Sequence, residues 1–250
     1  MKTTWNRRMG EKPRLTLARL AMTAAASLAV ALALSACENV ATYTQPSLVR
    51  VIDASYIAPA VNVVVEGTLL ASNIGQGTIS DYGTLPASNN AVIKVTAATG
   101  GATLVTSDGT LMAGHQHSVF LTDNGVAPTS YTVTVLEDQQ VSAAGGHSAF
   151  RFLNQAPKTG GVDVYMIPGT TTLANTIPIA TNLPVGSTAG YISFTSQTVT
   201  MVITPTGTTT VKYTSTPLAL TGGEVRTVLI VDTQLTSDPP VAVFMANDVN

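Results

Sequence analysis

Residues 48–53 read Leu48-Val49-Arg50-Val51-Ile52-Asp53, and residues 61–66 read Val61-Asn62-Val63-Val64-Val65-Glu66. In both stretches branched apolar residues recur at every second position, which is the period of a β-strand with one buried face. Beyond residue 46, similar short runs are separated by Gly, Pro, Asn, Asp and Ser at intervals of about 8 to 12 residues, a spacing typical of sandwiches and barrels. Only 10% of the residues are charged, and no long stretch has a helical period. We therefore predict an all-β fold.

Both stretches are repeated further along the chain. At an offset of 101, Val49-Arg50-Val51 corresponds to Phe150-Arg151-Phe152, and Val61-Asn62-Val63 corresponds to Val162-Asp163-Val164. At an offset of 109, residues 111–123 correspond to residues 220–232. Two offsets that differ by eight residues are expected of a duplicated domain in which one loop has lengthened. We predict two tandem immunoglobulin-like β-sandwich domains, with a barrel as the alternative, because strand number and alternation do not separate these architectures.

The repeat sets the expected domain boundaries. They are a first sandwich over residues 47–137, a polar and glycine-containing linker over 138–147, and a second sandwich over 148–250. Arg50 and Arg151 are out of phase with their apolar neighbours, so we expect them to face solvent or to cap a sheet edge while the neighbours point inward.

The N-terminus has the order of a bacterial lipoprotein signal. Arginines are followed by an apolar run over residues 20–34 and then by Ser35-Ala36-Cys37. A run of about 15 residues is short for a bilayer span of roughly 20 but fits the apolar region of a signal peptide. We predict a signal peptide over residues 1–36 and a lipidated tether over residues 37–46. Counted from Leu15 the run is longer, so an uncleaved membrane anchor is the alternative.

Cys37 is the only cysteine in the chain, so it has no partner for an intramolecular disulfide. A lone cysteine in an extracytoplasmic protein requires another role. Its place directly after two small residues and an apolar run predicts that it carries the lipid, such as palmitate, and joins the protein to the membrane. Glu38 is not the Asp that commonly retains a lipoprotein at the inner membrane. This favours the outer membrane, with the protein on its periplasmic or surface face.

Charge excludes one class of partner. Without residues 1–36, the chain of 214 residues holds six basic and thirteen acidic residues, a formal net charge of −7. A nucleic-acid-binding surface needs clustered Lys and Arg, and none are clustered here. The expected partners are the membrane, through the lipid on Cys37, and envelope proteins or glycans.

His115 and His117 are the best candidates for a metal site. Alternate residues of a strand share a face, so the two imidazoles would lie close enough to hold one ion, with His147 or an Asp as a third ligand. The corresponding residues of the second copy are Glu224 and Arg226, however. Two polar positions that are filled differently in each copy are more typical of an exposed strand edge. We therefore expect no metal and no cofactor.

No motif for catalysis is present in the sequence. It lacks Gly-x-Ser-x-Gly, and its single cysteine is assigned to the lipid. Most aspartates lie at expected strand ends or turns, where Asp bonds to nearby backbone groups. The sequence thus predicts no catalytic residues, and we expect a protein that is not an enzyme.

The stretches 48–55 and 58–63, the second copy about a hundred residues later and the lipoprotein signal together resemble the bacterial family called domain of unknown function 4397. The resemblance implies tandem β-sandwich domains in envelope-attached or secreted proteins, with no established activity and no site residues to transfer. The second copy departs from the pattern at Asn154-Gln155 and in the turn at 158–161.

These observations lead to one expected function and one alternative. We expect a lipid-anchored cell-envelope protein with a structural or protein-interaction role. The alternative is a module that binds glycan or peptide in a groove between the two domains.

Overall fold

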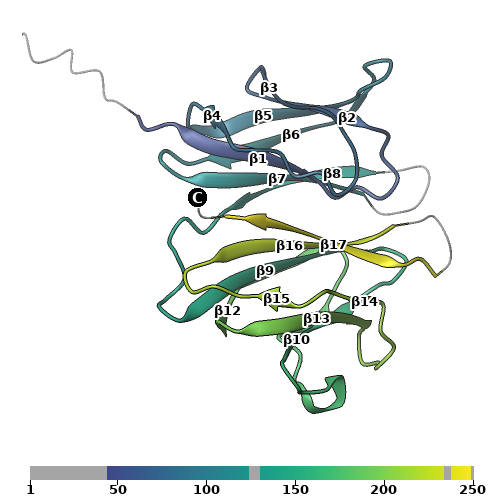
Figure 1. The fold of residues 1–250 in the computed structure, drawn as a ribbon. Helices are drawn as coiled ribbons and strands as arrows, with labels where there is room; N and C mark the ends of the chain where they lie inside the picture. The colour runs from purple at the N-terminus through teal and green to yellow at the C-terminus, as the bar shows by residue number, and fades with distance from the viewer. Residues whose placement is uncertain (1–43, 124–129, 234–237, 249–250) are drawn as a thin grey trace, which may run out of the picture. The chain divides into compact units, whose positions relative to one another are not determined.

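The computed structural model describes residues 44–123, 130–233 and 238–248, and residues 44–250 form one compact unit. Seventeen strands and one short 3-10 turn are found in the described residues. We call the part that contains β1–β8 the first half and the part that contains β9–β17 the second half (Figure 1). No helix within these described ranges has the length and apolar character needed to cross a bilayer. The predicted signal peptide and Cys37 lie outside the described residues.

The first half consists of two four-stranded sheets. One has the order β4-β1-β7-β8 and the other β3-β2-β5-β6. The strands are β1 (Ser47–Asp53), β2 (Val61–Val65), β3 (Thr68–Ile74), β4 (Gly83–Leu85), β5 (Ser88–Ala97), β6 (Thr103–Leu111), β7 (Gln116–Asp123) and β8 (Tyr131–Glu137).

The second half also consists of two sheets. One has the order β12-β9-β16-β17, and the other has the order β11-β10-β13-β14, with β15 also paired to β13. The elements are β9 (His147–Gln155), β10 (Val162–Pro168), η1 (Leu173–Asn175), β11 (Ala180–Leu183), β12 (Ser187–Thr195), β13 (Thr198–Pro205), β14 (Tyr213–Thr214), β15 (Leu218–Ala219), β16 (Val225–Asp232) and β17 (Val241–Asn247).

Each half has its own apolar core between its two sheets. In the first half the alternating residues of β2, Val61, Val63 and Val65, are fully buried and pack in one cluster with Val49 and Val51 of β1. In the second half, a separate cluster contains Phe150 and Phe152 of β9. The two-residue period of the sequence thus gives the inward face of each strand correctly, and the predicted all-β sandwich class is confirmed.

The two halves share an uncommon strand pairing. β1 pairs in parallel with β7, and β9 pairs in parallel with β16. Val49 lies opposite His117 in the first pair, and Phe150 lies opposite Arg226 in the second. These partners are related by the same offsets of 101 and 109 that relate the sequences.

β3 is a strand that an alternation of buried and exposed residues does not mark. Its residues are mostly exposed and show little alternation of burial. It follows the tight turn at Glu66-Gly67, where both residues have positive φ (49° and 76°). β6 is nine residues long and ends at Leu111, whereas β4 has only three residues.

Candidate functional site

A buried polar cluster lies where the first half meets the second, and Arg50 of β1 is at its centre. Arg50 is only 2% exposed. Its Nε donates to Ser118 Oγ at 2.7 Å, its Nη1 donates to the carbonyl oxygen of Asn247 at 2.9 Å, and its Nη2 donates to the carboxylate of Asp248. The guanidinium also lies over the ring of Tyr82, 4.9 Å from its centroid. Arg50 therefore bonds within its own half and to the end of the other.

Arg151 of β9 makes the reciprocal set of contacts. Its Nε donates to Thr227 Oγ1 at 3.1 Å, its Nη1 donates to the carbonyl oxygen of Glu137 at 3.0 Å, and its Nη2 donates to the carboxylate of Asp138. The guanidinium lies over the ring of Tyr191 at 4.9 Å. Each half thus supplies an arginine to the other half and an aspartate that receives the other half's arginine.

Both carboxylates are held by a hydroxyl and a phenol of their own half. Asp138 accepts from Ser118 Oγ at 2.7 Å and from Tyr82 OH at 2.7 Å. In the second half, Asp248 accepts from Thr227 Oγ1 at 2.7 Å and from Tyr191 OH at 2.6 Å. Neither side chain is exposed. Such complete bonding offsets the large free-energy cost of removing two ion pairs from water.

Burial and neighbouring charges both act on the pKa values of these groups. Burial alone would lower the pKa of Arg50, but the carboxylates of Asp248 and Asp138 outweigh it, so its pKa is raised. Burial raises the pKa of the Tyr82 phenol, with the charge of Asp138 as a further cause, and burial likewise raises the pKa of Tyr191. At neutral pH Arg50 is therefore charged, and the phenols of Tyr82 and Tyr191 are neutral.

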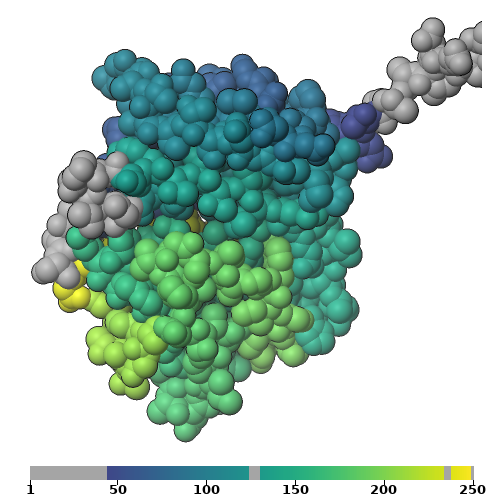
Figure 2. Space-filling model, turned by 180° about the vertical axis from the view of Figure 1, so that it is seen from behind, coloured from purple at the N-terminus to yellow at the C-terminus, as the bar shows by residue number. Residues whose placement is uncertain are grey.

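An apolar layer surrounds this cluster on the same strand faces. It contains Ile52 of β1, Phe120 of β7, Leu153 of β9 and Leu229 of β16, each 5% exposed or less. The backbone at Gly77 lies close to the ring of Phe244, because a Cβ on Gly77 would lie 2.4 Å from that ring. Along these strands the two halves are packed against each other, and Figure 2 shows the teal atoms of the first half adjoining the green atoms of the second half on the face that it draws.

The structure corrects the prediction for the two arginines. Arg50 and Arg151 were expected to face solvent or cap a sheet edge, and both are buried. Their phase was assigned correctly, since each points away from the core of its own sandwich. The outer face of each sheet is covered by the other half, which the alternation of one strand does not reveal. Asp138, the first residue of the predicted linker, is likewise buried in this contact.

The structure places the candidate metal ligands His115 and His117 with their ring centroids 6.5 Å apart. His117 uses both ring nitrogens: Nε2 accepts from the Met112 backbone N–H at 3.3 Å, so Nδ1 carries the proton and donates to Ser47 Oγ at 2.9 Å. Burial lowers its pKa. His115 is exposed and paired with Glu137.

The candidate third ligand, His147, bonds to the carbonyl oxygen of Gly145 at the start of β9. Within the described part of the chain no three His, Cys, Asp or Glu side chains gather as a metal site would require. These residues therefore do not assemble the metal centre that was considered for them.

Two aspartates at strand ends bind the backbone of a turn. In each case the turn follows the parallel neighbour of the strand that carries the aspartate. Asp123 at the end of β7 accepts the backbone N–H groups of Tyr56 and Ile57 at 2.6 and 2.8 Å. In the second half, Asp232 at the end of β16 accepts the N–H of Lys158 at 2.6 Å. Each carboxylate holds the chain that follows the parallel partner strand.

Asp53 differs from its counterpart in the second half, Asn154. Both side chains accept the backbone N–H two residues later at 3.0 Å. The amide Nδ2 of Asn154 donates to two carbonyl oxygens at 2.8 Å, whereas Oδ2 of Asp53 is buried without a hydrogen-bond partner. Burial raises the pKa of Asp53 to about 6. A proton on Oδ2 would make Asp53 resemble the neutral amide.

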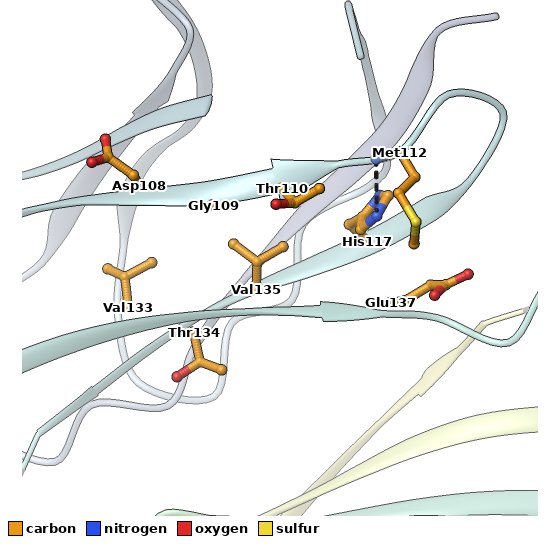
Figure 3. A pocket seen from close by; sticks show the side chains of 9 residues that line it. All are labelled: Asp108, Gly109, Thr110, Met112, His117, Val133, Thr134, Val135 and Glu137. Carbon is orange, nitrogen blue, oxygen red and sulfur yellow. Dashed lines mark hydrogen bonds between the residues drawn. The ribbon is translucent and has the colours of Figure 1, made fainter. Parts of the chain in front are cut away.

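A groove of about 430 Å³ opens in the first half between β6 and β8 (Figure 3). Asp108 and Thr110 line it from β6, and Val133, Val135 and Glu137 line it from β8. Gly109 allows the two strands to approach, because a Cβ on it would lie 2.5 Å from Val135 Cγ2. Sequence reasoning did not identify this groove, since it depends on which edges of the two sheets face each other.

Comparison with known families gives a match over nearly half of the chain. Residues 47–165 match the model of the family described as Domain of unknown function (DUF4397). The resemblance found in the sequence is confirmed. The DUF4397 match covers the first half, β9 and the start of β10, which includes Arg50, Asp138 and Arg151.

Two further comparisons add little. The chain is similar to a crystal structure of CBMbc (family CBM26) from Eubacterium rectale Amy13K in complex with maltoheptaose. The identity is 9% and the TM-score is 0.25, over 79% of this chain and 96% of that chain. The curated proteins include no match to this chain.

Proposed function

We propose that the protein is a lipid-anchored component of the bacterial cell envelope with a structural or protein-interaction role and without catalytic activity. The reciprocal contacts of Arg50 and Arg151 carry this proposal, because they bind the two sandwiches into one body. A rigid body on a short tether suits a part that must hold position, or present a surface, close to a membrane. The buried charges of the cluster bond to one another across the two halves.

The anchoring part of the proposal rests on residues 1–38 of the sequence. Metabolic labelling with a lipid precursor tests it in cells that produce the wild type or Cys37→Ala. We expect label on the wild type alone, and the variant to leave the membrane fraction. Glu38→Gln is the matched control and should be labelled like the wild type. An unlabelled wild type, or a variant that stays equally membrane-bound, would contradict anchoring through Cys37.

The same experiment tests sorting to the outer membrane. Glu38→Asp introduces the residue that commonly retains lipoproteins at the inner membrane. We expect this variant to be lipidated but to move to the inner-membrane fraction on a density gradient. Wild type that already fractionates with the inner membrane would contradict the proposed location.

Binding of a glycan or peptide is the second candidate function. The groove between β6 and β8 favours it, since carboxylates and hydroxyls there surround a valine-lined floor. Cross-linking in intact cells, followed by identification of the attached molecules, tests the interaction role as a whole. A wild type that cross-links to no protein or glycan would contradict that role.

A further inference from the structure

We propose that the groove between β6 and β8 binds an extended peptide that carries two basic residues four positions apart, and that the peptide adds as a strand along the outer edge of β6. The inference rests on the interaction role proposed above and specifies the chemistry of the partner. Three observations carry it: the state of the two edges, the contrast with the second half, and the charges that line the groove.

β6 and β8 are edge strands of different sheets that face each other. β6 ends the order β3-β2-β5-β6, and β8 ends the order β4-β1-β7-β8. In the part of the chain that the structure describes, β6 pairs with β5 alone and β8 pairs with β7 alone, so no hydrogen-bond ladder joins the two edges. The outward N–H and C=O groups of an edge strand are the usual template for an added strand.

The second half closes the corresponding edge. β13 corresponds to β5, and its outer neighbours are the two-residue strands β14 and β15, which are separated by Ser215-Thr216-Pro217. Short, interrupted edges and proline are common means of preventing strand addition. β6 is nine residues long and contains no proline. The second half thus interrupts this edge of its sandwich, whereas the first half keeps the corresponding edge continuous along β6.

The lining of the groove selects the charge of the partner. Asp108 and Glu137 are its charged members, and neither Lys nor Arg lines it. Figure 3 shows Asp108 near the Val133 end and Glu137 at the other end of the groove. His115 lies outside the lining and pairs with Glu137. Opposite charge at both ends favours a basic ligand over a neutral or acidic one.

Strand geometry sets the spacing of the two basic residues. Val133 and Glu137 are four residues apart on β8, which corresponds to roughly 13 Å of strand. Residues i and i+4 of an extended peptide point to the same side, so both can reach the carboxylates while i+2 meets the valines. A peptide with basic residues at i and i+3 would direct one of them away.

Calorimetry on the detergent-purified full chain tests the proposal with three synthetic probes. The matching probe is acetyl-Lys-Thr-Val-Thr-Lys-amide. The control probes carry Glu in place of both Lys, or carry Lys at positions 1 and 4. We expect the matching peptide to bind at least about tenfold more tightly than either control. Equal binding of all three probes would overturn the proposal.

Charge reversal locates the site. Asp108→Lys combined with Glu137→Lys should weaken binding of the matching peptide at least about tenfold, whereas Asp81→Lys, an exposed acid outside the groove, should leave it unchanged. Strand addition also predicts that amides of β6 gain protection from hydrogen exchange when the peptide binds. Unchanged affinity in the double variant, or binding without such protection, would contradict the proposal.

Failure here is distinguishable from failure of the proposed function. Cellohexaose serves as a glycan probe in the same calorimetry. If cellohexaose binds and the peptide does not, the groove binds glycan and the peptide inference is wrong. If proteins still cross-link to the double variant as to the wild type, the interaction role stands on another surface and only this groove is excluded. Loss of lipid labelling would contradict the anchoring and leave this inference intact.

Discussion

Arg50 on β1 donates a hydrogen bond to Asp248, which lies 198 residues later in the chain, just after β17. The reciprocal bond from Arg151 to Asp138 spans only 13 residues. One pair therefore joins the beginning of the described chain to its end, and the other joins neighbouring segments. If one half unfolded alone, the arginine and the aspartate of the other half would lose their partners. We therefore expect the two halves to unfold together.

Replacement of Arg50 by Met should be strongly destabilising. The variant leaves the Asp248 carboxylate buried without its cation, and loss of one partner of a buried ion pair costs about 3–5 kcal/mol in the free energy of unfolding. Chemical denaturation followed by fluorescence measures this loss. Arg151→Met should behave alike, because its contacts are equivalent.

Two further variants serve as controls for that result. Lys94→Met removes an exposed lysine from β5 and should change stability little. Arg50→Met combined with Asp248→Asn should lose less than the sum of the single variants, because the second change removes the unpaired charge. Simple additivity would argue against a direct pair, and two separate unfolding transitions in the wild type would contradict coupled unfolding.

The sequence predicts which residues of a strand point toward the core better than it predicts what packs on the outer face of the strand. The alternation in β1 correctly places Val49 and Val51 in the core. It also places Arg50 on the opposite face. The alternation of one strand does not show whether solvent or a second sheet covers that face. The groove between β6 and β8 was missed for the same reason, since it arises from the juxtaposition of two sheets. Glu66-Gly67 is the local signal that could have located β3, because two residues with positive φ form a hairpin turn.

Asp53→Asn should remove a dependence of stability on pH. Burial raises the pKa of Asp53 to about 6 from an ordinary value of 3.8. The folded chain therefore holds a proton between about pH 4 and pH 6 that the unfolded chain has released. Stability from this group is complete below pH 4, declines as the pH rises to 6 and stays low above it. The Asn variant lacks the decline.

Denaturation at pH 4 and at pH 7 measures this effect. Relative to the wild type, Asp53→Asn should gain about 3 kcal/mol in the free energy of unfolding between the two pH values, at roughly 1.4 kcal/mol per pKa unit. Asp81→Asn, at an exposed position, is the matched control and should show no such gain. A difference between Asp53→Asn and wild type that does not change with pH would mean that folding does not raise the pKa of Asp53.

His117 should titrate below the usual range of histidine. Burial lowers its pKa from 6.5, and its two ring nitrogens are bonded in the neutral form. Because the folded pKa lies below the unfolded one, this group reduces stability as the pH falls below about 6.5, which is opposite to the effect of Asp53. NMR titration of the imidazole protons measures the pKa, and a His115→Gln variant assigns the signals. A pKa at or above 6.5 for His117 would contradict its bonded neutral form.

Gly109→Ala should separate the edges of β6 and β8. The added Cβ would lie 2.5 Å from Val135 Cγ2 and 3.2 Å from Ile93 Cδ1, so the side chains must shift. Crowding of this kind costs about 1–3 kcal/mol in the free energy of unfolding. Val135→Ala removes the nearer methyl group, and in the Gly109→Ala background it should restore part of the lost stability. Gly190→Ala is the matched control, because a Cβ added to Gly190 would meet nothing within 4 Å. If Val135→Ala destabilises the Gly109→Ala protein as much as it does the wild type, the two strands are not in contact at this point.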